Sequence, residues 1–362
     1  MKFIVVAGGQ GTKLWPYSRE SKPKQFQPIV GELTPFQENI NVLLKRYAPE
    51  DIFVSTKRKF IKYVSEQTPQ IPLKNYIIEP DIAKDRGPGE GFAFLKLSIL
   101  HPDEPVFLIQ GDCIRKPEER FLDMVEEAGK IVERDKTYLT GGIKATEADM
   151  GVDFIQLGDR VSDTNMDIYN IDAFVERKST YQETKELIEN FRIVTHCNHL
   201  CWYPGMVIDA YKEFRPDWYE ALMKIKDVLD KPGEDAAVEA IYETMEKGST
   251  EEVTKHVMQS GKACVMILPF VWTDIGTWGS VYEYFTEGNS HDNYTDCQTV
   301  TVDVAGSLIK TSNEKKLVAV AGMEDVVIVD TDDILLVIPK NKIEKIKQLQ
   351  ALLAEQDKKE YL

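Results

Sequence analysis

The N-terminal stretch "KFIVVAGGQGTKLWPYSRESKPKQF", residues 2–26, opens with an apolar run and passes directly into a loop with three glycines. This order predicts a buried strand that ends in a turn able to hold phosphate oxygens. Gly8, Gly9 and Gly11 would let backbone amides approach an anion closely, because glycine has no side chain in the way. The alternative is a turn that only connects a strand to a helix.

Basic residues then gather in the same stretch, although the whole chain carries a formal net charge of -16. Lys13 and Lys24 could converge on a small polyanion such as a triphosphate, and Pro23 would stiffen the approach to Lys24. A solvated charged loop is the alternative. The acidic balance of the chain opposes an extended grip on nucleic-acid polymers or anionic membranes.

Outward from this stretch, short apolar runs alternate with segments of helical pattern. Residues 51–67 indicate a strand, a short connection and an amphipathic helix; further apolar runs lie at 75–80, 105–113 and 137–145, and further helical patterns at 91–100 and 118–134. Such alternation predicts a Rossmann-like α/β fold, with a mixed, mostly parallel sheet and helices on both faces. Ligands of such sheets bind at the carboxyl ends of the strands, where both the glycine loop and "QGDC" would lie.

Two domains are expected from the 362 residues. Strands at 152–161 and 170–179 and helices at 180–191 and 216–230 suggest an insertion that lines the second half of a site. Alternating apolar strands within 315–340 and a helix at 342–356 follow a polar stretch. We therefore expect a nucleotide-handling domain at 1–288 and a small β-rich domain, ending in a helix, at 289–362.

Five cysteines without regular spacing do not resemble a disulfide scaffold, and we expect reduced thiols in a cytoplasmic protein. The apolar start is too short for a secretory signal, and no later run approaches the length of a membrane span. We expect a soluble protein.

Residues 7–26, "AGGQGTKLWPYSRESKPKQF", resemble the signature of the sugar nucleotidyltransferases of the mannose-1-phosphate guanylyltransferase type, AGGxGTRLWPxSRxxxPKQF. The segments "IIEP", "QGD", "FVER", "VWTDIGTW" and "GMEDVVIVDTDDILLVIPK" follow in the family's order. The resemblance covers essentially the whole chain. It implies transfer of a nucleotidyl group from a nucleoside triphosphate, GTP being favoured, to a sugar 1-phosphate, mannose 1-phosphate being favoured.

The resemblance also assigns residues. Lys24 would contact the sugar phosphate or the α-phosphate, and Lys13, where the family usually has arginine, would face the departing pyrophosphate. Asp112 and Asp274 would hold Mg²⁺, because magnesium prefers oxygen ligands; each aspartate could instead cap a turn. The implied nucleotide-binding set is Ala7, Gly8, Gly9, Gly11, Thr12, Lys13, Glu79, Pro88 and Gly111.

The implied sugar-phosphate set is Lys24, Gly151, Asp153, Glu176, Arg177 and Tyr203. Here the chain departs from the family. GDH becomes "GDC" with Cys113, GYGYI becomes "GVDFI" with Val152 and Asp153, EKP becomes "ERK", and WNSG becomes "WYPG". The family's acidic DYxVxE element is replaced by something like "VTKHVMQ". Lys84 or Arg86 would replace the arginine of EPxxRNTAPA.

Two explanations compete for these departures. The chain is either an enzyme retuned to another sugar 1-phosphate or a catalytically inactive, nucleotide-binding regulatory paralogue. Survival of Lys24, Asp112, Glu176 and Asp274 favours the enzyme. The apolar C-terminal strands would close over the site or support a homodimer.

Overall fold

The computed structural model describes residues 1–9, 11–146, 148–313 and 315–362, and the chain divides into two compact units. The first unit contains Met1–Gly8, Ile40–Gln110 and Arg115–Val271, and the second contains Gly9–Asn39, Gly111–Ile114 and Trp272–Leu362. The chain therefore passes between the units at 8/9, 39/40, 110/111, 114/115 and 271/272. Three of these passages lie in the glycine loop, in "QGD" and in "VWTD".

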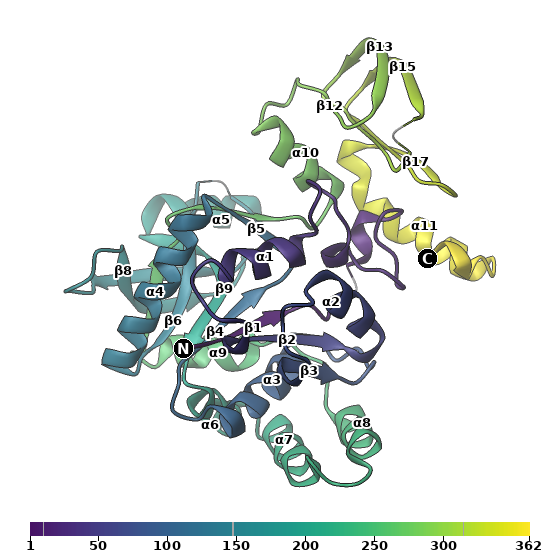
Figure 1. Ribbon diagram of the computed structural model, residues 1–362. Helices are drawn as coiled ribbons and strands as arrows, with labels where there is room; N and C mark the ends of the chain where they lie inside the picture. Colours follow the sequence, from purple (N-terminus) through teal and green to yellow (C-terminus); the bar gives the residue numbers. More distant parts are fainter. Residues whose placement is uncertain (10, 147, 314) are drawn as a thin grey trace. The chain divides into compact units, whose positions relative to one another are not determined.

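A nine-stranded sheet forms the centre of the first unit (Figure 1). In spatial order its strands are β3 (Tyr76–Glu79), β2 (Ile52–Lys57), β1 (Lys2–Val6), β4 (Val106–Gln110), β9 (Ile193–Trp202), β6 (Tyr138–Lys144), β10 (Ala263–Ile267), β8 (Ile168–Val175) and β7 (Phe154–Arg160). β1 is apolar throughout its middle and fully buried there, as a strand covered on both faces requires.

Strand directions confirm the predicted mixed, mostly parallel sheet. β3, β2, β1 and β4 pair in parallel, and β10 is parallel to β6. β9 is antiparallel to both of its main neighbours, β4 and β6, and β8 is antiparallel to β10 and β7. Only β8 and β9 of these nine described strands thus run against the rest. The carboxyl ends of β1, β2 and β3 consequently share one edge.

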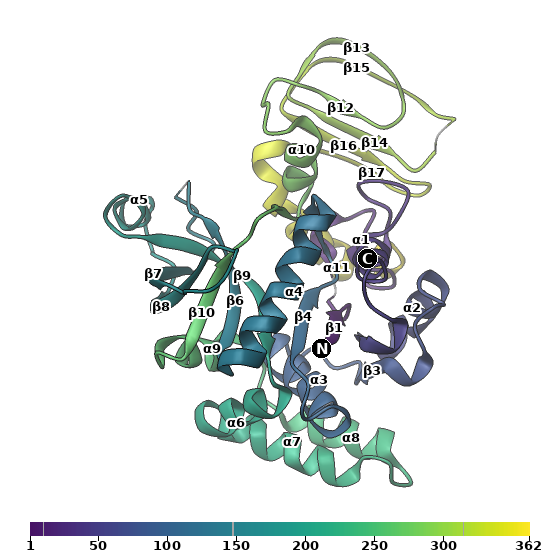
Figure 2. The same cartoon turned by 60° about the vertical axis from the view of Figure 1, so that its left-hand side comes forward.

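The helices of the first unit are α2 (Ile61–Gln67), α3 (Arg86–Leu100), α4 (Glu118–Asp135), α5 (Tyr181–Asn190), α6 (Pro204–Phe214), α7 (Pro216–Val228), α8 (Glu234–Thr244) and α9 (Glu251–Gln259). α4 packs against β6 and β9, and α9 against β8 and β10. Figure 2 shows α6, α7 and α8 gathered beside α3. The helix α1 (Pro35–Leu43) spans a passage between the units.

The C-terminal half of the second unit is rich in strands, as predicted (Figure 2). Its elements are β11 (Val271–Asp274), α10 (Trp278–Thr286), β12 (Tyr294–Thr295), β13 (Gln298–Ala305), β14 (Leu308–Thr311), β15 (Leu317–Glu324), β16 (Val326–Asp330), β17 (Leu335–Pro339) and α11 (Ile346–Glu355). β13 pairs in parallel with β15, and β14 with β16. From β12 to β16, successive strands therefore alternate between two sheets and the chain winds as a coil, whereas β17 returns antiparallel to β16 in the same sheet.

The glycine loop's second half belongs to the same hydrophobic core as these strands. Leu14 and Trp15 are buried with Trp278, Val327 and Ile338. The indole Nε1 of Trp278 donates to the carbonyl of Trp15 at 2.9 Å. The segment that follows the glycines is thus anchored on the C-terminal part of the chain.

Among the described residues, no helix combines the length and the apolar character that crossing a membrane demands.

Candidate active site

Three residues far apart in the sequence meet in the second unit. The ammonium Nζ of Lys24 lies 2.8 Å from Asp112 Oδ2 and 3.0 Å from Asp274 Oδ1. Lys24 opens the short helix Lys24–Phe26, which Pro23 caps in an extended conformation. Asp112 precedes β5 (Cys113–Lys116), and Asp274 ends β11; these two strands pair as a two-stranded sheet. The strand pairing explains why the two carboxylates converge.

The opposite charges of this cluster stabilise the ionised forms of Lys24 and Asp112. Burial by itself lowers the pKa of Lys24, but the carboxylates of Asp112 and Asp274 outweigh it and raise the pKa above its ordinary value. Burial likewise raises the pKa of Asp112, yet the neighbouring Lys24 brings it below its ordinary value. At neutral pH the cluster is therefore one ammonium held between two carboxylates.

Gly11 supports Lys24 from the loop. Its φ of +55° lies in the left-handed region, and an added Cβ would stand 2.7 Å from Lys24 Cγ. Both the conformation and the close approach therefore require glycine here. Gly9 differs, because nothing lies within 4 Å of a Cβ built there, and its carbonyl accepts from Gln25 Nε2 at 2.8 Å.

The short helix Thr12–Leu14 continues the loop. The carbonyl of Thr12 accepts a hydrogen bond from Gln350 Nε2 at 3.1 Å. The Lys13 side chain is exposed to solvent. A cation at this position is therefore available to an anion from outside.

The carboxylate pair fits a magnesium ion that is shared with a substrate. Asp112 and Asp274 direct oxygens at one small volume, since both lie within 3.0 Å of the same nitrogen. No group of three or more His, Cys, Asp or Glu residues that could hold a metal occurs in the part of the chain that the structure describes. Magnesium bound by one or two carboxylates takes its remaining ligands from water and phosphates.

Glu79 lies at the edge of the first unit's sheet where β1 and β2 end. It is buried and accepts from Ser55 Oγ at 2.7 Å, and burial raises its pKa despite that bond. A Cβ at Gly8 would lie 3.5 Å from its carboxylate, and one at Gly89 2.8 Å. The structure thus brings Gly8 close to Glu79 and to the start of α3, which contains Pro88.

Ala7 joins this edge through its backbone, because its amide donates to the Ser55 carbonyl at 2.8 Å. Gly111, by contrast, belongs with Asp112 in the second unit.

A pocket of about 360 Å³ opens in the first unit and contains three of the predicted sugar-binding residues. Its lining is Asp153, Phe174, Glu176, Arg177, Ser249, Glu251, Glu252 and Lys255. Arg177 donates from Nε to Asp153 Oδ1 at 3.1 Å and from Nη2 to Oδ2 at 2.9 Å. Its Nη1 donates to the Gly151 carbonyl at 3.0 Å, which brings Gly151 to the same wall.

The other wall comes from α9, which contains "VTKHVMQ" but whose residues were not among the predicted site residues. Lys255 Nζ donates to Glu176 Oε1 at 2.8 Å. Glu251 pairs with Arg86, whose Nε donates to Glu90 at 2.9 Å. Acidic and basic residues four positions apart in "EEVTK" were the available signal, because that spacing puts both on one helix face.

Behind this wall, β9 contributes half-buried polar side chains. His196 packs edge-on against Phe174, and its Nε2 lies 3.0 Å from Thr140 Oγ1. Burial is the main cause that lowers the pKa of His196 to about 4; Arg86 acts in the same direction, and the carboxylates of Glu251 and Asp153 oppose it. With its amide oriented to suit both neighbours, Asn198 donates to Glu251 and accepts from Arg86 at 2.8 Å each.

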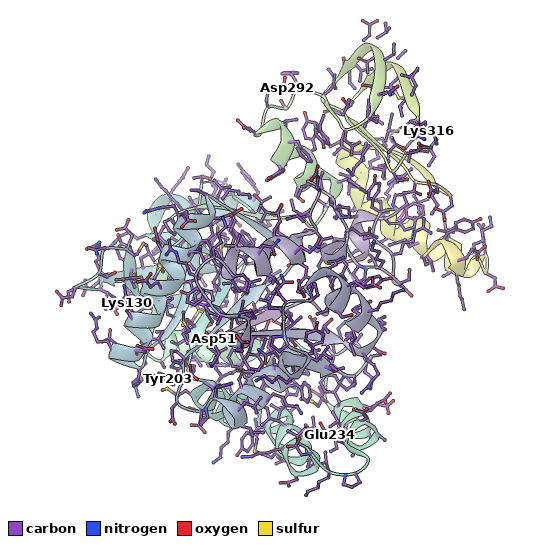
Figure 3. The ribbon with its side chains drawn as sticks, in the orientation of Figure 1. Asp51, Lys130, Tyr203, Glu234, Asp292 and Lys316 are labelled. Carbon is purple, nitrogen blue, oxygen red and sulfur yellow. The ribbon has the colours of Figure 1, made fainter. Side chains whose placement is uncertain are left out.

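Tyr203 is not among the pocket residues. It caps the start of α6, its hydroxyl accepts from Lys136 Nζ at 2.5 Å, and Figure 3 shows it beside that helix. Cys113 is buried, and its thiol donates to Asp112 Oδ1 at 3.6 Å. Val152 packs against a small cluster that contains Phe154 and Leu187. Lys84 turns to the carbonyl of Glu243 at 2.6 Å.

Comparison with known proteins places this geometry in context. Residues 2–291 match the family described as nucleotidyl transferase, and residues 298–352 match the one described as the MannoseP isomerase/GMP-like beta-helix domain. Mannose-1-phosphate guanylyltransferase 2 of Escherichia coli O157:H7 is 28% identical, over 99% of this chain and 74% of that protein. The alginate biosynthesis protein AlgA of Pseudomonas syringae pv. tomato is 26% identical, over 99% and 72%.

A solved structure described as mannose-1-phosphate geranyltransferase from Thermus thermophilus has the same fold. Its TM-score is 0.83 at 21% identity, and the likeness covers 98% of this chain and 99% of that one.

Proposed function

The chain belongs to the nucleotidyl transferase family, and we propose that it joins a nucleoside triphosphate and a sugar 1-phosphate into an NDP-sugar with release of pyrophosphate. The family match confirms the resemblance seen in the sequence. GTP and mannose 1-phosphate are the favoured substrates, because several relatives over 99% of the chain are named mannose-1-phosphate guanylyltransferases. The observation that carries the proposal is Lys24 between Asp112 and Asp274.

In this reaction an oxygen of the sugar phosphate attacks the α-phosphorus, and the bond from that phosphorus to the β-phosphate oxygen breaks. Negative charge moves onto pyrophosphate, so catalysis depends on positioning and charge neutralisation. Lys24 would place its ammonium against the reacting phosphates. Asp112 and Asp274 would hold Mg²⁺, and that ion would supply positive charge to offset the charge of the phosphates.

The remaining assignments concern the glycine loop, the nucleotide pocket and the two predicted domains. Backbone amides of Gly8, Gly9, Gly11 and Thr12 would receive phosphate oxygens beside Ala7, and exposed Lys13 would face pyrophosphate. Gly111 would leave room for the nucleotide, and Glu79 and Pro88 would neighbour the base. We assign nucleotidyl transfer to 1–288 and a supporting role, with a possible homodimer, to 289–362.

The cysteine thiols support a cytoplasmic location for this protein. All five cysteines are unbridged in the described chain, as a reducing compartment favours.

A panel of nucleoside triphosphates against sugar 1-phosphates, read out as pyrophosphate release, tests the proposal. We expect release with at least one pair, dependence on added Mg²⁺, and loss with Asp112→Asn. The Asp292→Asn variant, at an exposed aspartate, is the matched control and should retain release. Nucleotide binding without product from any pair would instead identify the inactive regulatory paralogue.

A further inference from the structure

The pocket in the first unit contains two basic side chains, and they differ in how fully their donors are occupied. Arg177 makes three directed contacts with Asp153 and Gly151, through Nε, Nη1 and Nη2. Its backbone amide also donates to Asp153 Oδ1 at 2.9 Å. Because the planar guanidinium is held on three sides, Arg177 acts as part of the pocket wall.

Lys255 is bound more loosely. Within the described residues, its ion pair joins it to Glu176 alone, at 2.8 Å. The Glu176 side chain is 68% exposed, so this pair is a solvated one that gains little from its charges. An ammonium has three donors, and one suffices for Glu176.

The helix under Lys255 is well fixed. α9 packs on β8 and β10. At its start, Thr250 Oγ1 donates to buried Glu90 at 2.7 Å, and Glu251 pairs with Arg86 at 3.4 Å. The flexible side chain of Lys255 therefore extends from a fixed helix into the pocket. A short movement of its ammonium would replace the contact with Glu176 by a contact with a bound anion.

The acidic residues of the pocket explain why this exchange matters. Asp153 is engaged by Arg177, Glu251 by Arg86, and Glu252 by Arg215. A ligand carrying negative charge would meet these carboxylates already neutralised. Lys255 is then the cation that such a ligand can recruit.

We propose that Lys255 is a specificity-determining residue that binds the phosphate of the sugar 1-phosphate and, in leaving Glu176, frees that carboxylate to accept hydrogen bonds from sugar hydroxyls. This inference rests on the proposed function. It adds to the assignments taken from the family resemblance a residue from a helix whose sequence departs from that family.

The test compares Lys255→Gln and Lys255→Arg with the wild type. Lys185→Gln, which removes a lysine of α5 paired with Glu189 outside the pocket, is the matched control. In steady-state assays, Lys255→Gln should raise KM for the sugar 1-phosphate about 10-fold to 100-fold, the usual effect of losing a charge-assisted hydrogen bond. KM for the nucleotide should stay within two-fold, Lys255→Arg should recover most of the loss, and the control should resemble the wild type.

Calorimetry with mannose 1-phosphate and with unphosphorylated mannose supplies a second readout that does not need turnover. Weaker binding of the phosphorylated sugar alone, in a variant that melts like the wild type, supports the inference. Unchanged affinity for mannose 1-phosphate, or an equal loss for both sugars, overturns it. A wild type that binds mannose 1-phosphate but releases no pyrophosphate with any pair would defeat the proposed reaction and leave this binding test decisive.

Discussion

Lys24 is the residue whose surroundings most constrain what the site can do. Its substitution by methionine keeps most of the unbranched stem but removes the ammonium, which leaves Asp112 facing Asp274 without a counter-charge. We expect kcat/KM for pyrophosphate release to fall about 10²-fold to 10³-fold, as for loss of a preorganised electrostatic contact. The pKa of Asp112 should rise, because Lys24 is what lowers it.

Lys310→Met is the matched control, since Lys310 is also a buried lysine of the second unit paired with an aspartate, Asp296. It should lower the melting temperature and leave kcat/KM of the folded protein within two-fold. Equal losses of activity in both variants would contradict a catalytic role for Lys24.

His196 predicts a specific pH dependence of stability. Its folded-state pKa of about 4 lies below the ordinary value of 6.5, so the unfolded chain binds the proton more readily between these values. The free energy of unfolding should therefore decrease as the pH falls from 6.5 to 4, by about 1.4 kcal/mol per pH unit for this proton. His196→Gln should flatten that slope in urea unfolding, whereas exposed His291→Gln should not. An unchanged slope in His196→Gln would refute the assignment.

Among the elements, the glycine loop offers a matched pair of substitutions. Gly11→Ala must adopt an unfavourable φ and push against Lys24, so we expect a loss of about 1–2 kcal/mol in the free energy of unfolding and a lower kcat. Gly9→Ala meets open space and should be nearly neutral in stability. Urea unfolding and initial rates on both variants test this, and equal behaviour would show that Gly11 does not support Lys24.

The strands and helices with clear periodicity were predictable, and two elements at or beside the pocket, β9 and α9, were less so. β1, β2, β4 and α4 appear where apolar spacing indicated. β9 carries "THCNH" through the middle of a sheet, because its polar side chains find partners such as Thr140 and Arg115 that no local pattern reveals. α9 was identified only as a departure from a motif, so Lys255 and Glu251 were missed.

At the scale of the whole molecule, the segment that follows the glycines is buried in a core that it shares with the C-terminal strands. Trp278→Phe removes the hydrogen bond to the Trp15 carbonyl and part of a fully buried ring. We expect a loss of about 1–3 kcal/mol in stability and a several-fold lower kcat, because the segment leading to Lys24 loses its anchor.

Trp218→Phe is the counterpart in the first unit, where a fully buried indole donates to the Glu246 carbonyl at 3.0 Å. It should cost similar stability, measured by urea unfolding, without the same fall in kcat. A drop in kcat confined to Trp218→Phe would contradict the role given to the shared core.

Sequence also indicated the convergence of Asp112, Asp274 and Lys24, through resemblance more than through pattern. Tyr203 lies outside the pocket that Asp153, Glu176 and Arg177 line, and its role in sugar binding stays a prediction. "WYPG" stands in place of the family motif WNSG. In this structure α6 begins at Pro204, because proline favours the first turn of a helix. A match of motif letters does not by itself determine where the side chain of Tyr203 lies.

The five passages of the chain between the units have a practical consequence for anyone who wishes to divide this protein. A single cut at any point leaves pieces of both units on at least one fragment, so no one-site proteolysis or gene truncation releases an intact half. Lys24, Asp112 and Asp274 come from three separate segments of the second unit. Expression of either terminal part by itself should therefore yield an incomplete site. An exchange of sequence within this gene would preserve activity only when its two crossovers enclose a whole segment of one unit, from one passage between the units to the next.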